Sequence, residues 1–165
     1  MALPRRKVRI AKGLRAFAVG ALALLGAAGP LAAAIGDRII GDRHTGVAIY
    51  GFDPVAYFTD AKPVAGRPEF ELQVADVIWR FRSAGNRAAF VANPDIYQPR
   101  FGGYDPVSLG RGIAVPGNPE LWLIQGDRLY FFYTPQAREA FAVDPETTVA
   151  VADERWPDVA RELAQ

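Results

Sequence analysis

Two stretches of equal length carry the pattern that decides the fold: DVIWRFRSAGNRAAFVANP at residues 76–94 and DRLYFFYTPQAREAFAVDP at residues 127–145. Each begins at a turn aspartate, runs through a short aromatic-rich segment typical of a strand, and reaches a serine or threonine that favours a helix start. Each closes with Asn-Pro or Asp-Pro, where a helix stops because the residue before proline avoids the helical region. The chain therefore contains the same strand-to-helix pattern twice.

A second strand precedes each of these stretches. Residues 70–74 alternate apolar and polar side chains, and residues 77–81 return as a strand after a two-residue turn. Residues 121–125 and 129–133 repeat this arrangement around a Gly-Asp turn, which is a common hairpin connection. The pattern predicts a β-hairpin followed by a helix in both halves.

The repeat extends upstream of the hairpins. GFDPV at residues 51–55 matches GYDPV at residues 103–107. This predicts an internal repeat with units at 51–100 and 103–150, each too small to bury its own apolar face. We expect an α+β fold in which two packed ββα-type units form one small domain, preceded by an N-terminal signal or anchor helix.

The beginning of the chain has the composition of an export signal. Residues 5–15 are basic, residues 16–29 are apolar and uncharged, and Ala32-Ala33-Ala34 supplies small residues for cleavage. Residues 1–34 are therefore predicted to be a secretory signal peptide or, if uncleaved, a membrane anchor.

The predicted signal at residues 1–34 determines how we expect the remaining chain to be organised and where we expect the protein to be located. We expect a polar linker at residues 35–45 and the folded domain at residues 46–165. The protein is predicted to be periplasmic or otherwise exported. Alternatively, residues 16–34 anchor the protein to the inner membrane, and this segment alone then contacts the membrane.

Charge and cysteine content exclude several classes of function. The net charge of +1 hides an asymmetry, because six of the 19 basic residues and none of the 18 acidic ones fall within residues 1–34. The remaining chain has 13 basic and 18 acidic residues, a net charge of −5. An acidic domain argues against a nucleic-acid partner. The absence of cysteine excludes disulfides, thiolate metal sites and cysteine nucleophiles.

Residues 46–157 resemble the YHS domain family, in its exported branch that lacks the metal-ligand cysteines. The resemblance rests on three stretches: GVAIYGFDPVAYF (46–58), IWRFRSAGNRAAFVANPDIYQPRFGGY (78–104) and ELWLIQGDRLYFFY (120–133). It implies a small α+β domain.

The chain departs from the family pattern at the cysteine positions. Metal-binding members are similar in pattern to DPVCGM followed by FCSxxCxxxF, whereas here Ala56, Arg82 and Asn86 stand at those positions. The exported branch often has a Gly-Gly-Tyr-Cys turn, and here Asp105 replaces that cysteine. No thiolate-bound metal is therefore expected, and the cofactor is left open.

The candidate ligand-binding residues are Asp53, Tyr57, Arg100, Tyr104 and Asp105. Asp53 and Asp105 occupy matching positions in the two units, so a cleft between the units would bring both carboxylates to it. The alternative is that both aspartates are helix caps or turn residues, since Asp-Pro is a common turn former. With His44, the two aspartates are also the candidate ligands of a hard metal ion, although His44 in the expected linker is better explained as a solvated residue.

Four consecutive aromatic residues, Tyr130-Phe131-Phe132-Tyr133, point to a further feature. Strand alternation places them on both faces of a sheet. Both faces are then covered, or one face lines a ligand groove or a partner surface.

These observations favour an exported, non-catalytic module that binds a small ligand or a periplasmic protein. No catalytic residue is assigned, and the chain is more readily explained as a binding protein than as an enzyme. The alternatives are an accessory metal-binding protein with oxygen or nitrogen ligands, and an enzyme of unknown type that uses the aspartate pair.

Overall fold

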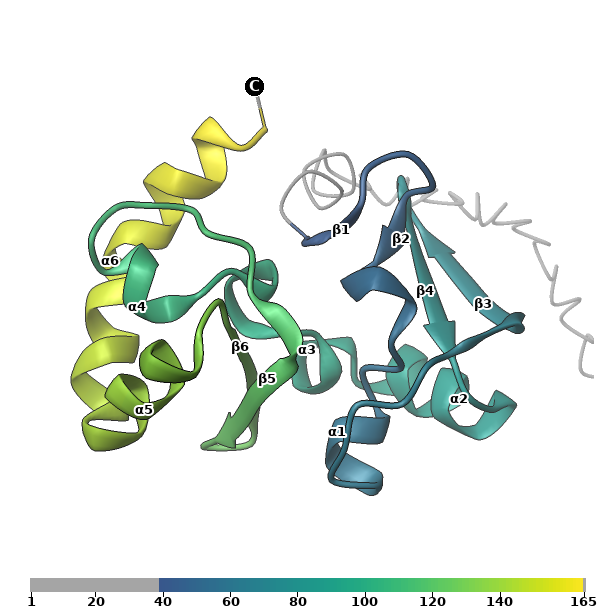
Figure 1. Ribbon diagram of the computed structural model, residues 1–165. Helices are drawn as coiled ribbons and strands as arrows, with labels where there is room; N and C mark the ends of the chain where they lie inside the picture. The colour runs from purple at the N-terminus through teal and green to yellow at the C-terminus, as the bar shows by residue number, and fades with distance from the viewer. Residues whose placement is uncertain (1–38, 165) are drawn as a thin grey trace, which may run out of the picture.

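The computed structural model describes residues 39–164 and shows a mixed α+β chain with two small sheets (Figure 1). The first sheet has the strand order β1 (Gly41–Asp42), β2 (Val47–Ala48), β4 (Val77–Phe81) and β3 (Arg67–Val74). The second sheet consists of β5 (Asn118–Gln125) and β6 (Arg128–Phe132). The α+β class is confirmed, whereas the signal or anchor at residues 1–34 lies outside the described residues.

Two antiparallel hairpins, β3–β4 and β5–β6, form at the two places where the sequence predicts pairs of strands. Each hairpin turn is two residues long, closed by the pairs Val74 with Val77 and Gln125 with Arg128. Both hairpins also shift register at the far end of their first strand, in β3 before Glu71 and in β5 before Trp122. In both hairpins, this register shift bends the first strand at the equivalent position.

A capped helix follows each hairpin, as the sequence predicts. Helix α2 (Ala84–Ala92) begins after Ser83, whose hydroxyl accepts a hydrogen bond from the backbone N–H of Asn86 at 3.1 Å. Helix α5 (Pro135–Val143) begins after Thr134, whose hydroxyl accepts from the backbone N–H of Ala137 at 3.1 Å. These caps satisfy N–H groups that the first helical turn leaves free.

The C-terminal helix is the longest of the described residues. Helix α6 runs from Pro145 to Glu162 as one element. The side chain of Asp144 accepts from Thr147 N at 3.1 Å and so fixes the start of the helix. The helix also continues through Pro157, so tertiary packing outweighs the hydrogen bond that this proline cannot make.

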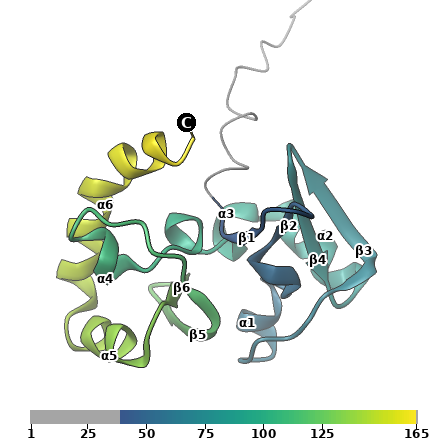
Figure 2. The ribbon, with the colours of Figure 1, turned by 45° about the horizontal axis from the view of Figure 1, so that its top comes forward.

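Short helical turns connect these elements. They are η2 (Ile49–Gly51), α1 (Ala56–Thr59), α3 (Pro94–Tyr97), η3 (Arg100–Gly103) and α4 (Pro106–Leu109). Figures 1 and 2 show β3, β4 and α2 on one side of the molecule and β5, β6, α5 and α6 on the other, with α3 between them.

Aromatic side chains form matching clusters on the two sides. Phe90 of α2 packs against Trp79 and Phe81 of β4, with ring centroids 4.9 and 5.2 Å apart. Phe141 of α5 packs in the same way against Tyr130 and Phe132 of β6, at 5.0 and 5.1 Å. Both groups belong to one continuous apolar core.

The aromatic run of β6 is covered on both faces. Tyr130, Phe131 and Phe132 are buried, because Phe141 covers one face and Tyr57 covers the other. Tyr133 alone projects from the run, with 60% of its surface exposed. The first of the two predicted outcomes therefore holds, with both faces of β6 covered, and the fourth ring lies beyond the end of the strand.

Residues 39–45 belong to the fold, although the sequence suggested a linker at residues 35–45. Ile40 is buried in the core, and its backbone N–H donates to Gly102 O at 2.9 Å. Its carbonyl accepts from Ile49 N at 2.7 Å. The segment is too short and too polar for its alternation to be visible in the sequence, yet it joins the two sides of the molecule. Across residues 39–164, no helix combines the length and the apolar character that a membrane span requires.

Candidate functional site

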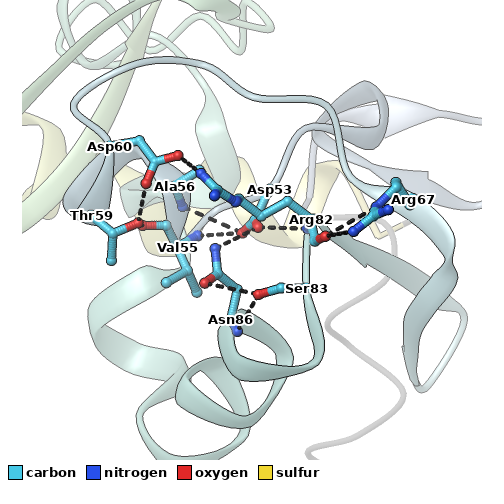
Figure 3. A network of polar contacts seen from close by, with 9 residues as sticks. All are labelled: Asp53, Val55, Ala56, Thr59, Asp60, Arg67, Arg82, Ser83 and Asn86. Carbon is cyan, nitrogen blue, oxygen red and sulfur yellow. Dashed lines mark hydrogen bonds and ion pairs between the residues drawn. The ribbon is translucent and has the colours of Figure 1, made fainter.

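Asp53 is fully buried, and its carboxylate accepts four hydrogen bonds (Figure 3). Oδ1 accepts from the backbone N–H groups of Val55 and Ala56 at 2.9 and 3.4 Å. Oδ2 accepts from Arg82 N and from Asn86 Nδ2, both at 2.7 Å. The charge of Asp53 therefore binds the Asp-Pro turn to the end of β4 and the start of α2.

Further polar contacts surround this carboxylate (Figure 3). Asp60, after α1, forms an ion pair with Arg82 and accepts from the hydroxyl of Thr59 at 3.0 Å. The guanidinium of Arg67 donates twice to the carbonyl of Arg82, at 3.1 and 2.6 Å. The end of β4 is thus held from both sides, by α1 and by β3.

Asp105 occupies the matching position on the other side of the molecule and is also fully buried. Its Oδ1 accepts from the backbone N–H groups of Val107 and Ser108 at 2.8 and 3.0 Å. Its Oδ2 accepts from Tyr133 N at 2.8 Å. One donor is missing relative to Asp53, because Ala137 stands where Asn86 supplies a side-chain amide.

These contacts define what the two carboxylates do in this structure. Each accepts from the backbone of its own turn and from the residue that follows the second hairpin strand. The two have no hydrogen-bond donor in common, and neither lines either of the cavities described below. Both aspartates therefore behave as buried caps, which was the simpler of the two interpretations of the sequence.

Tyr57 links the two sides of the molecule. Its hydroxyl donates to Pro119 O at 3.0 Å, and its ring packs against Trp122 and Phe131 with centroids 5.2 and 5.3 Å apart. Burial, and then the negative charges of Glu120 and Asp53, raise the pKa of Tyr57 well above its ordinary value. The phenol therefore stays neutral and serves as a hydrogen-bond donor.

Arg100 and Tyr104 lie next to the C-terminal helix. The guanidinium of Arg100 forms an ion pair with Asp153 of α6 and lies 5.0 Å from the centroid of the Phe101 ring. Tyr104 is almost fully buried, with its ring centroid 6.0 Å from that of Trp156. Arg100 is thus engaged with α6, while Tyr104 contributes to a cavity.

That cavity has a volume of about 360 Å³ and lies between the first sheet and the second side of the molecule. Residues 39–43 and 46–48, which include β1 and β2, line it together with Tyr50, Asp76 and Val77. Tyr104, Pro116 and Leu163 line it from the other side. Of the five candidate ligand-binding residues, Tyr104 alone lines this cavity.

A second, more exposed hollow has a volume of about 410 Å³, and we call it the inter-unit groove. Tyr50 and Phe52 line it from the first half of the chain, and Tyr133 and a proline-containing segment line it from the second. Its lining residues are Tyr50, Phe52, Pro116, Gly117, Asn118, Pro119, Glu120 and Tyr133. The sequence does not predict these residues as a site, although the run of aromatics that ends at Tyr133 indicates one of them.

The backbone at Tyr50 is unusual for a tyrosine. Tyr50 has φ of +54° and leaves 52% of its surface exposed. The equivalent residue in the second half is Gly102, with φ of +61°, and glycines follow at both places with φ of +84° and +88°. A left-handed conformation strains any residue with a Cβ, so this turn favours glycine and yet presents a tyrosine to the groove.

His44 lies away from both aspartates. Its side chain is 98% exposed in the turn between β1 and β2, and its backbone N–H donates to Asp42 Oδ1 at 2.8 Å. Within residues 39–164, no three His, Asp or Glu side chains are gathered closely enough to hold a metal ion. The structure therefore does not bring His44, Asp53 and Asp105 together.

Comparison of the chain with protein-family models, with curated proteins and with solved structures found no match.

Proposed function

We propose that this protein is a non-catalytic binding module that holds a small ligand in the inter-unit groove. The groove carries the proposal because both halves of the chain build it and because it exposes aromatic side chains. Tyr50 and Tyr133 line it and leave 52% and 60% of their surfaces exposed to solvent. Its volume of about 410 Å³ falls within the range typical of small-molecule sites.

The strained turn at Tyr50 supports the same proposal. A positive φ at a residue with a Cβ costs about 1–3 kcal/mol and tends to occur where a side chain is needed for function. The equivalent turn in the second half has glycine and forms the same backbone. The tyrosine is therefore not required by the turn, and ligand contact explains its presence.

The engagement of the buried carboxylates supports a binding role over a catalytic one. A general base or nucleophile needs a lone pair directed at the substrate. Asp53 accepts four hydrogen bonds and Asp105 accepts three, all from groups that hold the fold together. Their oxygens are occupied by structural donors.

The wider setting of the module is part of the proposal. We take residues 51–100 and 103–150 as two ββα-type copies of one motif, packed into a single YHS-like domain. The matched hairpin bends, caps and aromatic clusters support the two copies of the motif. The basic and apolar composition of residues 1–34 supports an exported protein, with its ligand taken from the periplasm or the exterior.

A fragment screen by ¹H–¹⁵N NMR tests the proposal. The purified chain is titrated with three mixtures of small molecules, which are cationic, neutral and anionic. We expect at least one mixture to shift the amide signals of Gly117, Glu120 and Tyr133, and the Tyr133→Ala variant to bind more weakly. Absence of any saturable shift at the groove in all three mixtures contradicts a ligand-binding role for it.

A further inference from the structure

We propose that the ligand of the inter-unit groove is a small organic cation, whose ammonium group lies among Tyr50, Phe52 and Tyr133 and is balanced by Glu120. This inference rests on the proposed function, because it names the chemical class of ligand for the same groove.

Aromatic residues form part of the lining of the inter-unit groove. Three of its lining residues are aromatic, two of them tyrosines that remain largely exposed to solvent. The face of a phenol or phenyl ring carries a partial negative charge and attracts a cation within about 6 Å of its centroid. Several rings around one hollow are the arrangement that recognises quaternary ammonium groups.

The formal charge of the groove has one sign. Glu120 is the only lining residue with a formal charge at neutral pH, and no Arg or Lys lines the groove. Among the residues that the structure describes, no ion pair involves Glu120. Its carboxylate is therefore available to a cationic ligand.

The charge of the whole domain acts in the same direction. From residue 35 onward the chain has 13 basic and 18 acidic residues, a net charge of −5. A negative domain raises the local concentration of cations and lowers that of anions. An anionic ligand is repelled by the unpaired carboxylate of Glu120, and a neutral ligand gains no charge attraction from it.

The test compares two molecules of nearly the same shape. Choline carries a trimethylammonium group, and 3,3-dimethylbutan-1-ol carries a neutral tert-butyl group in its place. We expect choline to bind the purified chain at least about fivefold more tightly, measured by ¹H–¹⁵N NMR shifts of Gly117, Glu120 and Tyr133. We also expect choline binding to weaken between about 0.02 and 0.5 M NaCl, because salt screens the exposed charge.

Matched variants assign the effect to named side chains. Glu120→Gln is expected to weaken choline binding about two- to fivefold and to leave the neutral alcohol unaffected. Glu139→Gln, which makes the same charge change on the exposed face of α5, is expected to change neither. Tyr133→Leu is expected to weaken choline about three- to tenfold, while Tyr133→Phe, which keeps the ring, retains most of the affinity. The thermal midpoint of each variant shows whether it is folded.

The outcomes separate this inference from the proposed function. Equal affinity for choline and its neutral counterpart, or no choline shift at about 20 mM, overturns the cation assignment. If a neutral or anionic fragment from the screen then shifts the groove signals, the groove is still a ligand site of another class. If no fragment does, both proposals fail together.

Discussion

At the scale of single residues, two buried aspartates perform the same structural task with unequal sets of donors. Asp53 has an additional partner in Asn86, while the second half has an alanine at that position. A hydrogen bond to a charged acceptor contributes about 1.5–3 kcal/mol, and loss of the charge leaves buried N–H donors poorly satisfied. The two sites are therefore expected to respond differently to mutation.

Asp53→Asn is expected to lower the free energy of unfolding by about 2–4 kcal/mol, because the introduced NH₂ group faces donors instead of accepting from them. Asn86→Ala, which gives the first site the donor set of the second, is expected to cost about 1–2 kcal/mol. Asp127→Asn is the control, since it changes the same charge in an exposed turn whose φ of +57° suits asparagine. Urea denaturation measures all three, and a neutral Asp53→Asn contradicts the structural role.

Replacing Tyr50 is expected to weaken ligand binding without lowering the stability of the fold. Tyr50→Gly removes the strain of a positive φ and copies Gly102 of the second half, so the free energy of unfolding is expected to stay level or rise by up to about 1 kcal/mol. Groove ligands are expected to bind at least about threefold more weakly. Thermal unfolding and an NMR titration measure the two effects. A large loss of stability shows that the ring is needed for the fold itself.

At the scale of elements, the hairpins and their capped helices were well predicted and the connections were not. Ser83 and Thr134 fix the starts of α2 and α5, and residues 70–74 alternate apolar and polar side chains. These signals are local and visible in one chain. Ile40 could not be placed from the sequence, because its burial depends on contact with Gly102 across the fold.

The inter-unit groove was even harder to predict from the sequence than the burial of Ile40. Asp53 and Asp105 stand out in the sequence because carboxylates at repeated positions suggest chemistry. Their Oδ1 atoms accept from backbone N–H groups two and three residues along the chain, but their Oδ2 atoms accept from Arg82 N and Tyr133 N, which only the fold brings there. Tyr50 and Tyr133 become neighbours of one groove through packing of the two halves. The exposed position of Tyr133 follows from the coverage of the preceding three aromatics, which the sequence left open.

Helix α6 contains a proline, Pro157, whose cost to stability can be measured by a single substitution. Pro157 lies in the helix interior at an exposed position, where it removes one backbone hydrogen bond. Pro157→Ala is expected to raise the free energy of unfolding by about 1–3 kcal/mol. Pro145→Ala at the first turn of the same helix is the control and is expected to be neutral or slightly destabilising, because proline suits that position. A destabilised Pro157→Ala variant indicates that the core requires a bend at this place.

At the scale of the whole molecule, Tyr57 couples the two halves and makes their stability depend on alkaline pH. The raised pKa keeps the phenol neutral in the folded state, while in the unfolded chain it ionises near its ordinary value of about 10. Its contribution is therefore fully present below about pH 10 and is lost as the pH rises above it.

Tyr57→Phe is expected to lower the free energy of unfolding at pH 7 by about 1 kcal/mol, through loss of the hydrogen bond to Pro119 O. The same variant is expected to lose less stability than the wild type between about pH 9 and pH 11. Part of the slope remains, because burial also raises the pKa of Tyr130. Urea denaturation across this pH range decides the point, and parallel slopes for the two proteins contradict it.

Intermolecular NOEs between a bound fragment and the protein test most directly whether both halves of the chain build the binding site. If the two halves together build the binding site, protons of the fragment are expected to show NOEs to the rings of both Tyr50 and Tyr133 in one complex. NOEs confined to one half of the chain, or found only at residues outside the groove, contradict the claim that this site is formed between the halves.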